Sequence, residues 1–444
     1  MKTSLRLLLI AAIIFVTLQF VRPGIPARPA TADLQAPPEV KQILNTSCYS
    51  CHSDERRLSW FDQVVPAYWL VRHDVLTARE HLNFSTLGSQ PAAAQKGVLY
   101  ESVNMVQLGA MPLPQFTMLH PKAKLTPQEI ATLKAYLAPW SATPPLGMSR
   151  DRRDETERVN LAAVLPEFNG LSFDAAFEGW KLISTTDRGD NNTFRFILGN
   201  DIALRAVRSG NILPWPDGAR LAKVAWQQEL GPNGLIYPGS FIQVELMVKD
   251  ASQFKATDGW GWGRWRGLDL KPYGHDAHVV DECTGCHMPV RRNDSVYTLP
   301  ITTAPITRQE VVNHRAATLP ASLPYQPLEW NAITMYVDPK AHTTATLYGN
   351  EKAIKVTHAN NPTELMAYAP GAVLALVTWA QRDDPHWFGA RIPDAPLSVE
   401  FVEVGTTTTY KKFAGATVGE ESTPAPLAQE RTKFILSLTP AQLP

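Results

Sequence analysis

All four cysteines of this chain lie in two Cys-x-x-Cys-His motifs, CYSCH at residues 48–52 and CTGCH at residues 283–287. Two thiols at this spacing can each bond to a vinyl group of one haem, and the adjacent imidazole then meets the iron. A thioredoxin-type pair or half of a zinc site has the same cysteine spacing, but a histidine would then have to follow twice by chance. The motifs therefore predict two covalently attached c-type haems. The expected attachment residues are Cys48, Cys51, Cys283 and Cys286, and the expected iron ligands are His52 and His287.

The N-terminus is typical of an exported protein. Lys2 and Arg6 precede an apolar run at residues 7–21, and Ala-Thr-Ala at residues 30–32 resembles a cleavage site. The run is shorter than the roughly 20 residues of a bilayer span. A signal peptide over residues 1–32 is therefore favoured, with an uncleaved membrane anchor as the alternative. Either form places the rest of the chain in the periplasm, free or anchored to the inner membrane, where haem attachment would keep the cysteines from pairing as disulfides.

Length and charge bound the remaining architecture. A chain of 444 residues has room for several domains. Lys and Arg number 42 and Asp and Glu number 42, so no excess of basic residues favours a nucleic acid partner. The 36 prolines argue against long helices through most of the chain. Changes of pattern predict domains at residues 33–144, 161–300 and 301–444, with a charged linker at residues 145–160.

The first of these domains has helical patterning. Thr126 is a suitable N-cap for a helix that ends near residue 137, because Pro127 takes the first helical position and Glu129 completes a capping box. The domain also resembles the bacterial haem-binding domain of the cytochrome c type. The residues that carry this resemblance are 48–53, Trp60, 66–70, 79–85 and 111–112.

A loop after the first motif offers a second iron ligand. Met111 precedes a proline in this loop, at the place where a small c-type cytochrome supplies its sixth ligand. A thioether ligand fills the iron site, so this haem is expected to carry electrons and not to bind substrate. Met111 could instead be a packing residue. Met118 is the alternative ligand and His120 a weaker one.

In the second domain the hydrophobic period changes to that of strands. Alternating positions at residues 193–198 and 241–248, and partly at 220–226, predict a mainly antiparallel sheet with one buried face. This domain resembles cytochrome P-460 and its relative cytochrome c′-beta. The supporting residues are 195–203, 214–218, 223–226, 259–263 and 283–287. The resemblance implies a haem at the C-terminal end of an antiparallel fold. In cytochrome P-460 a lysine is also bonded to the porphyrin rim and the enzyme oxidises hydroxylamine, whereas the c′-beta relatives bind nitric oxide.

The third domain has no cysteine but repeats the second. Gly349-Asn350 echoes Gly199-Asn200, and residues 370–379 echo residues 217–226. The repeat predicts a second P-460-like fold without haem. The copies differ where chemistry is expected, since Lys223 is matched by Leu376 and Arg195 by Ala345. Residues found only in the haem-bearing copy are therefore candidates for the site.

The second haem is expected to have an open iron. Met288 follows the motif directly and cannot reach the far side of the ring. An open iron can bind small nitrogen compounds. Lys223 is the candidate for the bond to the porphyrin that the resemblance implies; a solvent-facing strand lysine is the alternative. Arg195 could pair with a haem propionate or a bound ligand. His278 is the candidate proton acceptor, because the sequence places no acid of residues 275–282 on the open face and an imidazole titrates near neutral pH.

These observations predict a helical cytochrome c-like domain followed by two mainly antiparallel β (α+β) P-460-like domains. The expected function is oxidation of hydroxylamine or a related nitrogen oxide at the second haem. Electrons would pass through the first haem to a soluble or membrane acceptor. A nitric-oxide-binding protein and a pure electron-transfer cytochrome are the alternatives.

Overall fold

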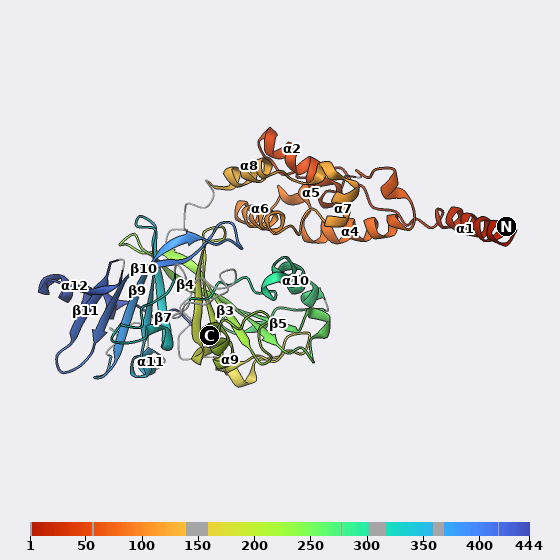
Figure 1. Ribbon diagram of the computed structural model, residues 1–444. Coiled ribbons are helices and arrows are strands. Elements are labelled where there is room, and N and C mark those ends of the chain that lie inside the picture. Colours follow the sequence, from red (N-terminus) through yellow and green to blue (C-terminus); the bar gives the residue numbers. More distant parts are fainter. Residues whose placement is uncertain are drawn as a thin grey trace. The chain divides into compact units, whose positions relative to one another are not determined.

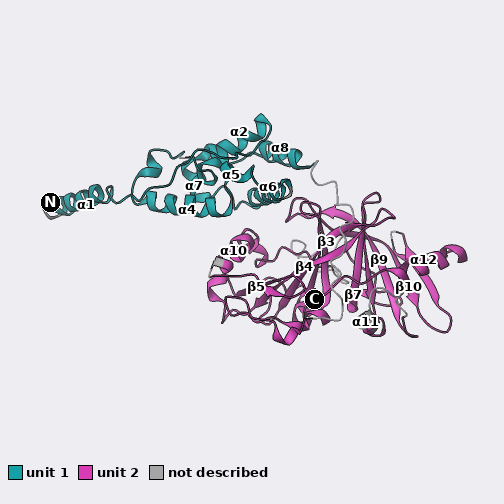
Figure 2. Cartoon of the chain, turned by 180° about the vertical axis from the view of Figure 1, so that it is seen from behind, with its two compact units in different colours: residues 1–141 teal, residues 142–444 magenta. Residues whose placement is uncertain are grey.

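The computed structural model describes residues 2–55, 57–138, 159–276, 278–301, 317–357, 368–415 and 417–444. The chain divides into two compact units, residues 1–141 and residues 142–444 (Figure 2). The first unit is helical and the second is built around a large antiparallel sheet (Figure 1). The predicted fold class is thus confirmed. The predicted linker at residues 145–160 lies outside the described residues, apart from its end at residues 159–160.

The first unit consists of short helices. In chain order they are α1 (Lys2–Leu18), α2 (Pro38–Ser47), α3 (Tyr49–His52), η1 (Phe61–Gln63), α4 (Ala67–His81), α5 (Phe84–Leu87), α6 (Ala92–Gln107), α7 (Pro114–Leu119), η2 (Pro121–Ala123) and α8 (Pro127–Leu137). The predicted capping box begins α8, since Thr126 Oγ1 accepts from the Glu129 amide and the Glu129 carboxylate accepts from the Thr126 amide. Among the described helices, none is long and apolar enough to cross a membrane.

The segment between α1 and α2 packs against the rest of the first unit. The Gln19 side chain donates to the Val65 carbonyl at 3.0 Å and accepts from the Val65 amide at 2.9 Å. Ile25 is buried in a cluster with Val65, Tyr68 and Val75. The chain that links the N-terminal helix to the first motif is therefore part of this unit's core.

The second unit contains the sheet in two consecutive runs of strands. The first run is β1 (Lys181–Arg188), β2 (Thr193–Gly199), β3 (Arg220–Leu230), β4 (Ile236–Lys249), β5 (Trp260–Arg266) and β6 (Lys271–Pro272), with helices α9 (Asp201–Ser209) and α10 (His278–His287). The second run is β7 (Asn331–Asp338), β8 (Thr343–Gly349), β9 (Val373–Asp383), β10 (Ala390–Glu403), β11 (Thr409–Ala414) and β12 (Gly419–Glu421), with α11 (Glu351–Thr357) and α12 (Ala425–Ser437). Every described strand pair is antiparallel.

The two runs repeat one design. β1, β2, β3 and β4 have 8, 7, 11 and 14 residues, and β7, β8, β9 and β10 have the same lengths in the same order. The runs join at two places: β1 pairs with β10, and β4 pairs with β7. Because β7 corresponds to β1 and β10 to β4, each join is the counterpart of the other. The second unit is therefore two copies of one fold related by an internal pseudo-two-fold axis.

The shared Gly-Asn pair has a structural role in both copies. The Asn200 side chain accepts from the Ala203 amide at 3.0 Å, which caps α9, and donates to the Gly218 carbonyl at 2.9 Å. Asn350 makes the matching bonds to Ala353 and Gly371, each at 3.0 Å. The two glycines whose carbonyls accept these bonds, Gly218 and Gly371, have positive φ angles of 82° and 86°, a conformation that other residues adopt with strain. The repeated motif thus fixes the helix and the turn beside it.

Candidate functional site

The first motif forms one helical turn. The amides of Cys51 and His52 both donate to the Cys48 carbonyl, at 3.2 and 2.9 Å, so the two thiols and the imidazole leave the same turn. His52 Nδ1 lies 3.2 Å from the Ala78 carbonyl of α4 and 3.1 Å from the carbonyl of Leu82, the residue that follows α4. These carbonyls require Nδ1 to donate, which leaves Nε2 available for a metal. Burial lowers the pKa of His52 and favours the neutral form that ligates iron.

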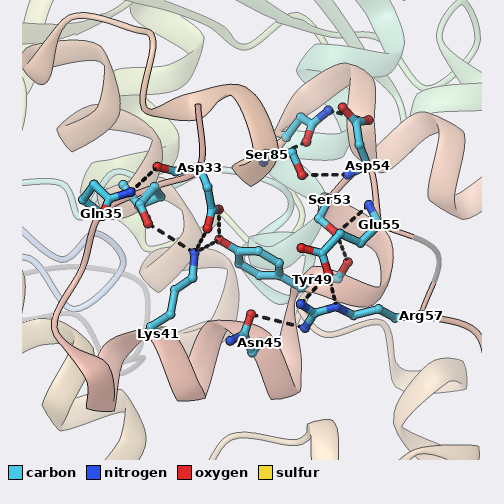
Figure 3. Close-up of polar contacts among 12 residues, drawn as sticks. Asp33, Gln35, Lys41, Asn45, Tyr49, Ser53, Asp54, Glu55, Arg57 and Ser85 are labelled. Carbon is cyan, nitrogen blue, oxygen red and sulfur yellow. Dashed lines mark hydrogen bonds and ion pairs between the residues drawn. The ribbon is translucent and has the colours of Figure 1, made fainter. Parts of the chain in front are cut away.

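Polar contacts hold this turn in place (Figure 3). The Tyr49 hydroxyl donates to Asp33 at 2.5 Å, and Lys41 forms an ion pair with the same carboxylate. The Tyr49 ring stacks on Phe84 with centroids 5.1 Å apart. The Ser53 hydroxyl donates to the Tyr49 carbonyl at 2.7 Å. The motif is thus tied to the segment that precedes α2.

The three candidate sixth ligands are in different environments. Met111 is half-buried, and its amide donates to the Met105 carbonyl at 3.1 Å. Met118 is 82% exposed. His120 Nε2 lies 2.9 Å from the Asp62 carboxylate, so that imidazole already has a partner. No hydrogen bond or ring contact joins any of the three to His52 in the described first unit, and Met111 stays a prediction.

The second motif ends α10. His287 Nδ1 lies 2.7 Å from the Ser295 carbonyl and must donate to it, which again leaves Nε2 available. The His287 ring packs against Trp262 at 4.3 Å and Tyr297 at 5.2 Å between centroids. Burial lowers the pKa of His287 to about 4, so the imidazole is neutral at physiological pH. It also raises the pKa of the Cys283 thiol to about 12.

A row of charged side chains lies on one face of the sheet beside this motif. Lys223 on β3 and Glu245 on β4 are register partners, with Nζ 2.5 Å from Oε2. Arg264 on β5 is the next partner, with Nε 3.2 Å from the other Glu245 oxygen. Arg264 also pairs at 3.2 Å with Glu282, the residue before Cys283. We call Lys223, Glu245 and Arg264 the charged cluster; it reaches α10 through Glu282.

Burial and charge set the protonation of the charged cluster. Burial lowers the pKa of Lys223 to about 8, and the attraction of Glu245 only partly opposes this. Burial alone would raise the pKa of Glu245, but the neighbouring Lys223 and Arg264 hold it well below its usual value. The charges of all three residues also act on the pKa of His287. The structure therefore brings Lys223 and the second motif into one site.

Arg195 lies on the same face of β2. It is two residues from Ile197, which is the register partner of Lys223. Burial lowers the pKa of Arg195 to about 9, and the charges of Glu245 and Cys286 also act on it. Its buried Nε has no hydrogen-bond partner among the described residues. A buried cation with an unused donor fits an anionic group that the protein itself does not provide.

The comparisons with known proteins agree with this geometry. Residues 13–139 match the family model described as Haem-binding domain, and residues 175–298 match the model described as Cytochrome P460. The second unit carries a cytochrome P460 domain. No curated protein matches the chain. The two resemblances drawn from the sequence are confirmed, and the matches support a haem cytochrome. The repeat that begins at β7 lies outside both matches.

The residues of the P460 domain fit a haem. None of the cysteines is in a disulfide, and each motif places its two thiols beside an imidazole with a free Nε2. The unused donor of Arg195 suits a propionate. Cys283, Cys286 and His287 would hold the group in the P460 domain, and Cys48, Cys51 and His52 would hold it in the haem-binding domain.

The sequence directed the search for an acid near the second motif to residues 275–282. The structure places another acid, Glu245 of β4, against Lys223. A signal was present, because Glu245 is the one acidic residue in the apolar run at residues 241–248. His278 begins α10, but its side chain lies outside the described residues. Met288 is 59% exposed next to the motif.

Proposed function

We propose that this chain is an exported dihaem c-type cytochrome that oxidises hydroxylamine or a related small nitrogen compound. The reaction would take place at the second motif, and electrons would leave through the haem of the first unit to a soluble or membrane-bound acceptor. One observation supports this most strongly. The half-buried charged cluster of Lys223, Glu245 and Arg264 reaches the second motif through Glu282, where it can move protons for a bound substrate.

Haem bound at the second motif supplies an iron centre that takes up electrons. Oxidation of hydroxylamine also releases protons, which need an acceptor within hydrogen-bond reach. Glu245 is our candidate in preference to His278, because its carboxylate is ionised and lies in the charged cluster.

Whether Lys223 is a charged ammonium or is bonded to the porphyrin would set the pKa of Glu245 and so its strength as a base. As an ammonium, Lys223 lowers the pKa of Glu245 and so weakens that carboxylate as a proton acceptor. A bond from the Lys223 nitrogen to the porphyrin rim would remove this charge. The pKa of Glu245 would then rise toward the range that suits proton transfer near neutral pH.

A nitric-oxide-binding protein of the c′-beta type is the main alternative. Such binding needs an apolar pocket and no proton acceptor. In the haem-free repeat Leu376 stands at the position of Lys223, and the facing Glu400 pairs with Arg431 instead. Only the haem-bearing copy has a lysine at this place that could bond to the porphyrin and so control the facing carboxylate, and we favour turnover for that reason.

Mass spectrometry and substrate oxidation test the proposal together. Haem peptides from the purified protein should show a third covalent link at Lys223, and that link should be lost in Lys223→Leu. The wild-type protein should reduce a chemical electron acceptor only when hydroxylamine is added. Nitric oxide binding without turnover would favour the c′-beta alternative. Low-spin spectra for both haems, with neither turnover nor nitric oxide binding, would leave only electron transfer.

A further inference from the structure

The haem-free repeat reaches the second motif through one loop. This loop, residues 384–389, connects β9 to β10 and packs on residues 293–297 of the P460 domain. His386 Nδ1 lies 2.6 Å from the Tyr297 carbonyl, and His386 Nε2 lies 3.1 Å from the Asn293 amide nitrogen. The carbonyl requires Nδ1 to donate and the amide requires Nε2 to accept. The two bonds therefore fit a single neutral tautomer.

Residues 293–297 in turn make the contacts that orient the haem ligand. The Ser295 carbonyl accepts from His287 Nδ1 at 2.7 Å. The Tyr297 hydroxyl donates to the Cys286 carbonyl at 2.7 Å, and its ring packs edge-on against His287 at 5.2 Å. His386 is thus hydrogen-bonded to this segment on both sides of Ser295, at Asn293 and at Tyr297.

Trp387 strengthens the same contact. Its ring packs edge-on against Tyr297 with centroids 5.6 Å apart. Its Nε1 donates to Asp190 at 3.3 Å, and the Arg188 guanidinium lies 4.1 Å above the ring. Arg188 and Asp190 form a buried ion pair next to the β1–β2 turn. The contacts of Trp387 with Arg188 and Asp190 therefore fix the loop to the haem-bearing copy.

The backbone of residues 293–297 is strained and depends on contacts with its neighbours. Asp294 and Ser295 are consecutive non-glycine residues with positive φ, 50° and 62°. Side chains rarely adopt this region, and a strained pair persists only where its surroundings hold it. The Asp294 carboxylate pairs with Lys249 at 2.8 Å and fixes one end. The two hydrogen bonds of His386 hold Asn293 and Tyr297 on either side of Ser295. The Ser295 carbonyl therefore stays within hydrogen-bond distance of His287.

We propose that His386 and Trp387 of the haem-free repeat are positioning residues for the iron ligand His287. The strength of the bond from His287 Nδ1 to the Ser295 carbonyl sets how much electron density the imidazole gives to iron. That in turn sets the iron–histidine bond and the reduction potential. The repeat without haem therefore tunes the haem of its neighbour. The inference rests on haem attachment at the second motif, as in the proposed function, but not on the reaction.

The test uses the full-length holoprotein with both haems. In His386→Ala we expect the iron–histidine stretch of the second haem to move to lower frequency in resonance Raman spectra. The reduction potential of the second haem should rise, because the imidazole then donates less electron density. His386→Gln should restore much of both signals, since its amide can donate to Tyr297 and accept from Asn293. The potential of the first haem is an internal control that should not move.

Two further variants separate a specific effect of His386 from a general effect of mutating the repeat and from a failure to fold. His342→Asn changes an exposed histidine of the same repeat and should leave both signals as in wild type. If His386→Ala fails to fold, Trp387→Phe keeps an aromatic side chain at this position but removes the bond to Asp190 and reduces the ring area under Arg188, and a smaller shift in the same direction is expected. A variant with haem on Cys283 and Cys286 but unmoved signals would overturn the inference alone. Absence of haem from these cysteines in the wild-type protein would overturn the proposed function as well.

Discussion

Replacing Glu245 with glutamine removes the negative charge of the charged cluster with little change of shape. The carboxylate accepts from Lys223 at 2.5 Å through one oxygen, and its other oxygen lies 3.2 Å from Arg264 Nε in an ion pair. A glutamine has one oxygen and an NH₂ group, so it can accept from only one of these cations and must turn a donor toward the other. A Lys223 that is not bonded to the porphyrin would lose its counter-charge, and Arg264 would keep only its pair with Glu282.

Stability and turnover should respond by different amounts. Removing one member of a buried ion pair costs about 3–5 kcal/mol, and the partial exposure of Lys223, 25%, and Glu245, 16%, points to the lower end. Loss of a proton acceptor should reduce kcat by about 100- to 10,000-fold. The pKa of Lys223 should fall further, because the carboxylate that raises it is gone. The link to the porphyrin should therefore still form.

The haem-free repeat offers a control at the same position of the fold. Glu400 faces Leu376 as Glu245 faces Lys223, and its carboxylate binds Arg431 at 2.8 and 2.7 Å. Glu400→Gln should lower the unfolding midpoint in urea without lowering kcat. Glu245→Gln should lower both, with haem content unchanged. Wild-type kcat in a folded, haem-loaded Glu245→Gln protein would refute the assignment of Glu245 as proton acceptor.

Three further predictions concern other parts of the chain. Because burial lowers the pKa of Lys223 to about 8, its amine becomes neutral above that pH. Joining this amine to a porphyrin carbon replaces an N–H and a C–H bond and releases two electrons and two protons, so the reconstitution includes an added oxidant such as peroxide. Under these conditions linking should speed up as pH rises through 8, and a flat profile by mass spectrometry would argue against an amine nucleophile. Deleting residues 1–32 removes buried Ile25 and should destabilise the first unit by about 2 kcal/mol or more in urea unfolding; an unchanged midpoint would show that this segment is not part of the core. Arg431→Leu leaves the buried Glu400 carboxylate without its cation and should cost about 3–5 kcal/mol by the same measurement. A loss no larger than that of a surface variant would contradict it.

Local signals in the sequence were sufficient for much of the fold. The Cys-x-x-Cys-His spacing requires one helical turn, and both motifs form it. The capping residues of α8 act within three positions of one another, so they could be read directly. The repeated Gly-Asn pair revealed the second copy because Asn200 and Asn350 each cap the helix that follows and hold the next turn.

The residues that the sequence did not reveal are joined only by tertiary structure. Glu245 meets Lys223 through the register of two neighbouring strands, and the alternation of β4 alone does not give that register. His386 comes from a different repeat than His287, and no local pattern relates a loop in one copy to a haem motif in the other. The polar character of Glu245 in an apolar strand was visible, but its partner was not.

The reciprocal pairing of β1 with β10 and of β4 with β7 has a consequence for how the protein responds to dilution. In a dimer of separate subunits, the loop that contacts residues 293–297 would dissociate from them as the protein concentration fell below the dissociation constant of the dimer. Here both copies belong to one chain, so mass action cannot separate them. The spectrum of the second haem should accordingly be the same at nanomolar and at millimolar protein. A repeat without a Cys-x-x-Cys-His motif can thus still act on the motif of its neighbour through this permanent contact.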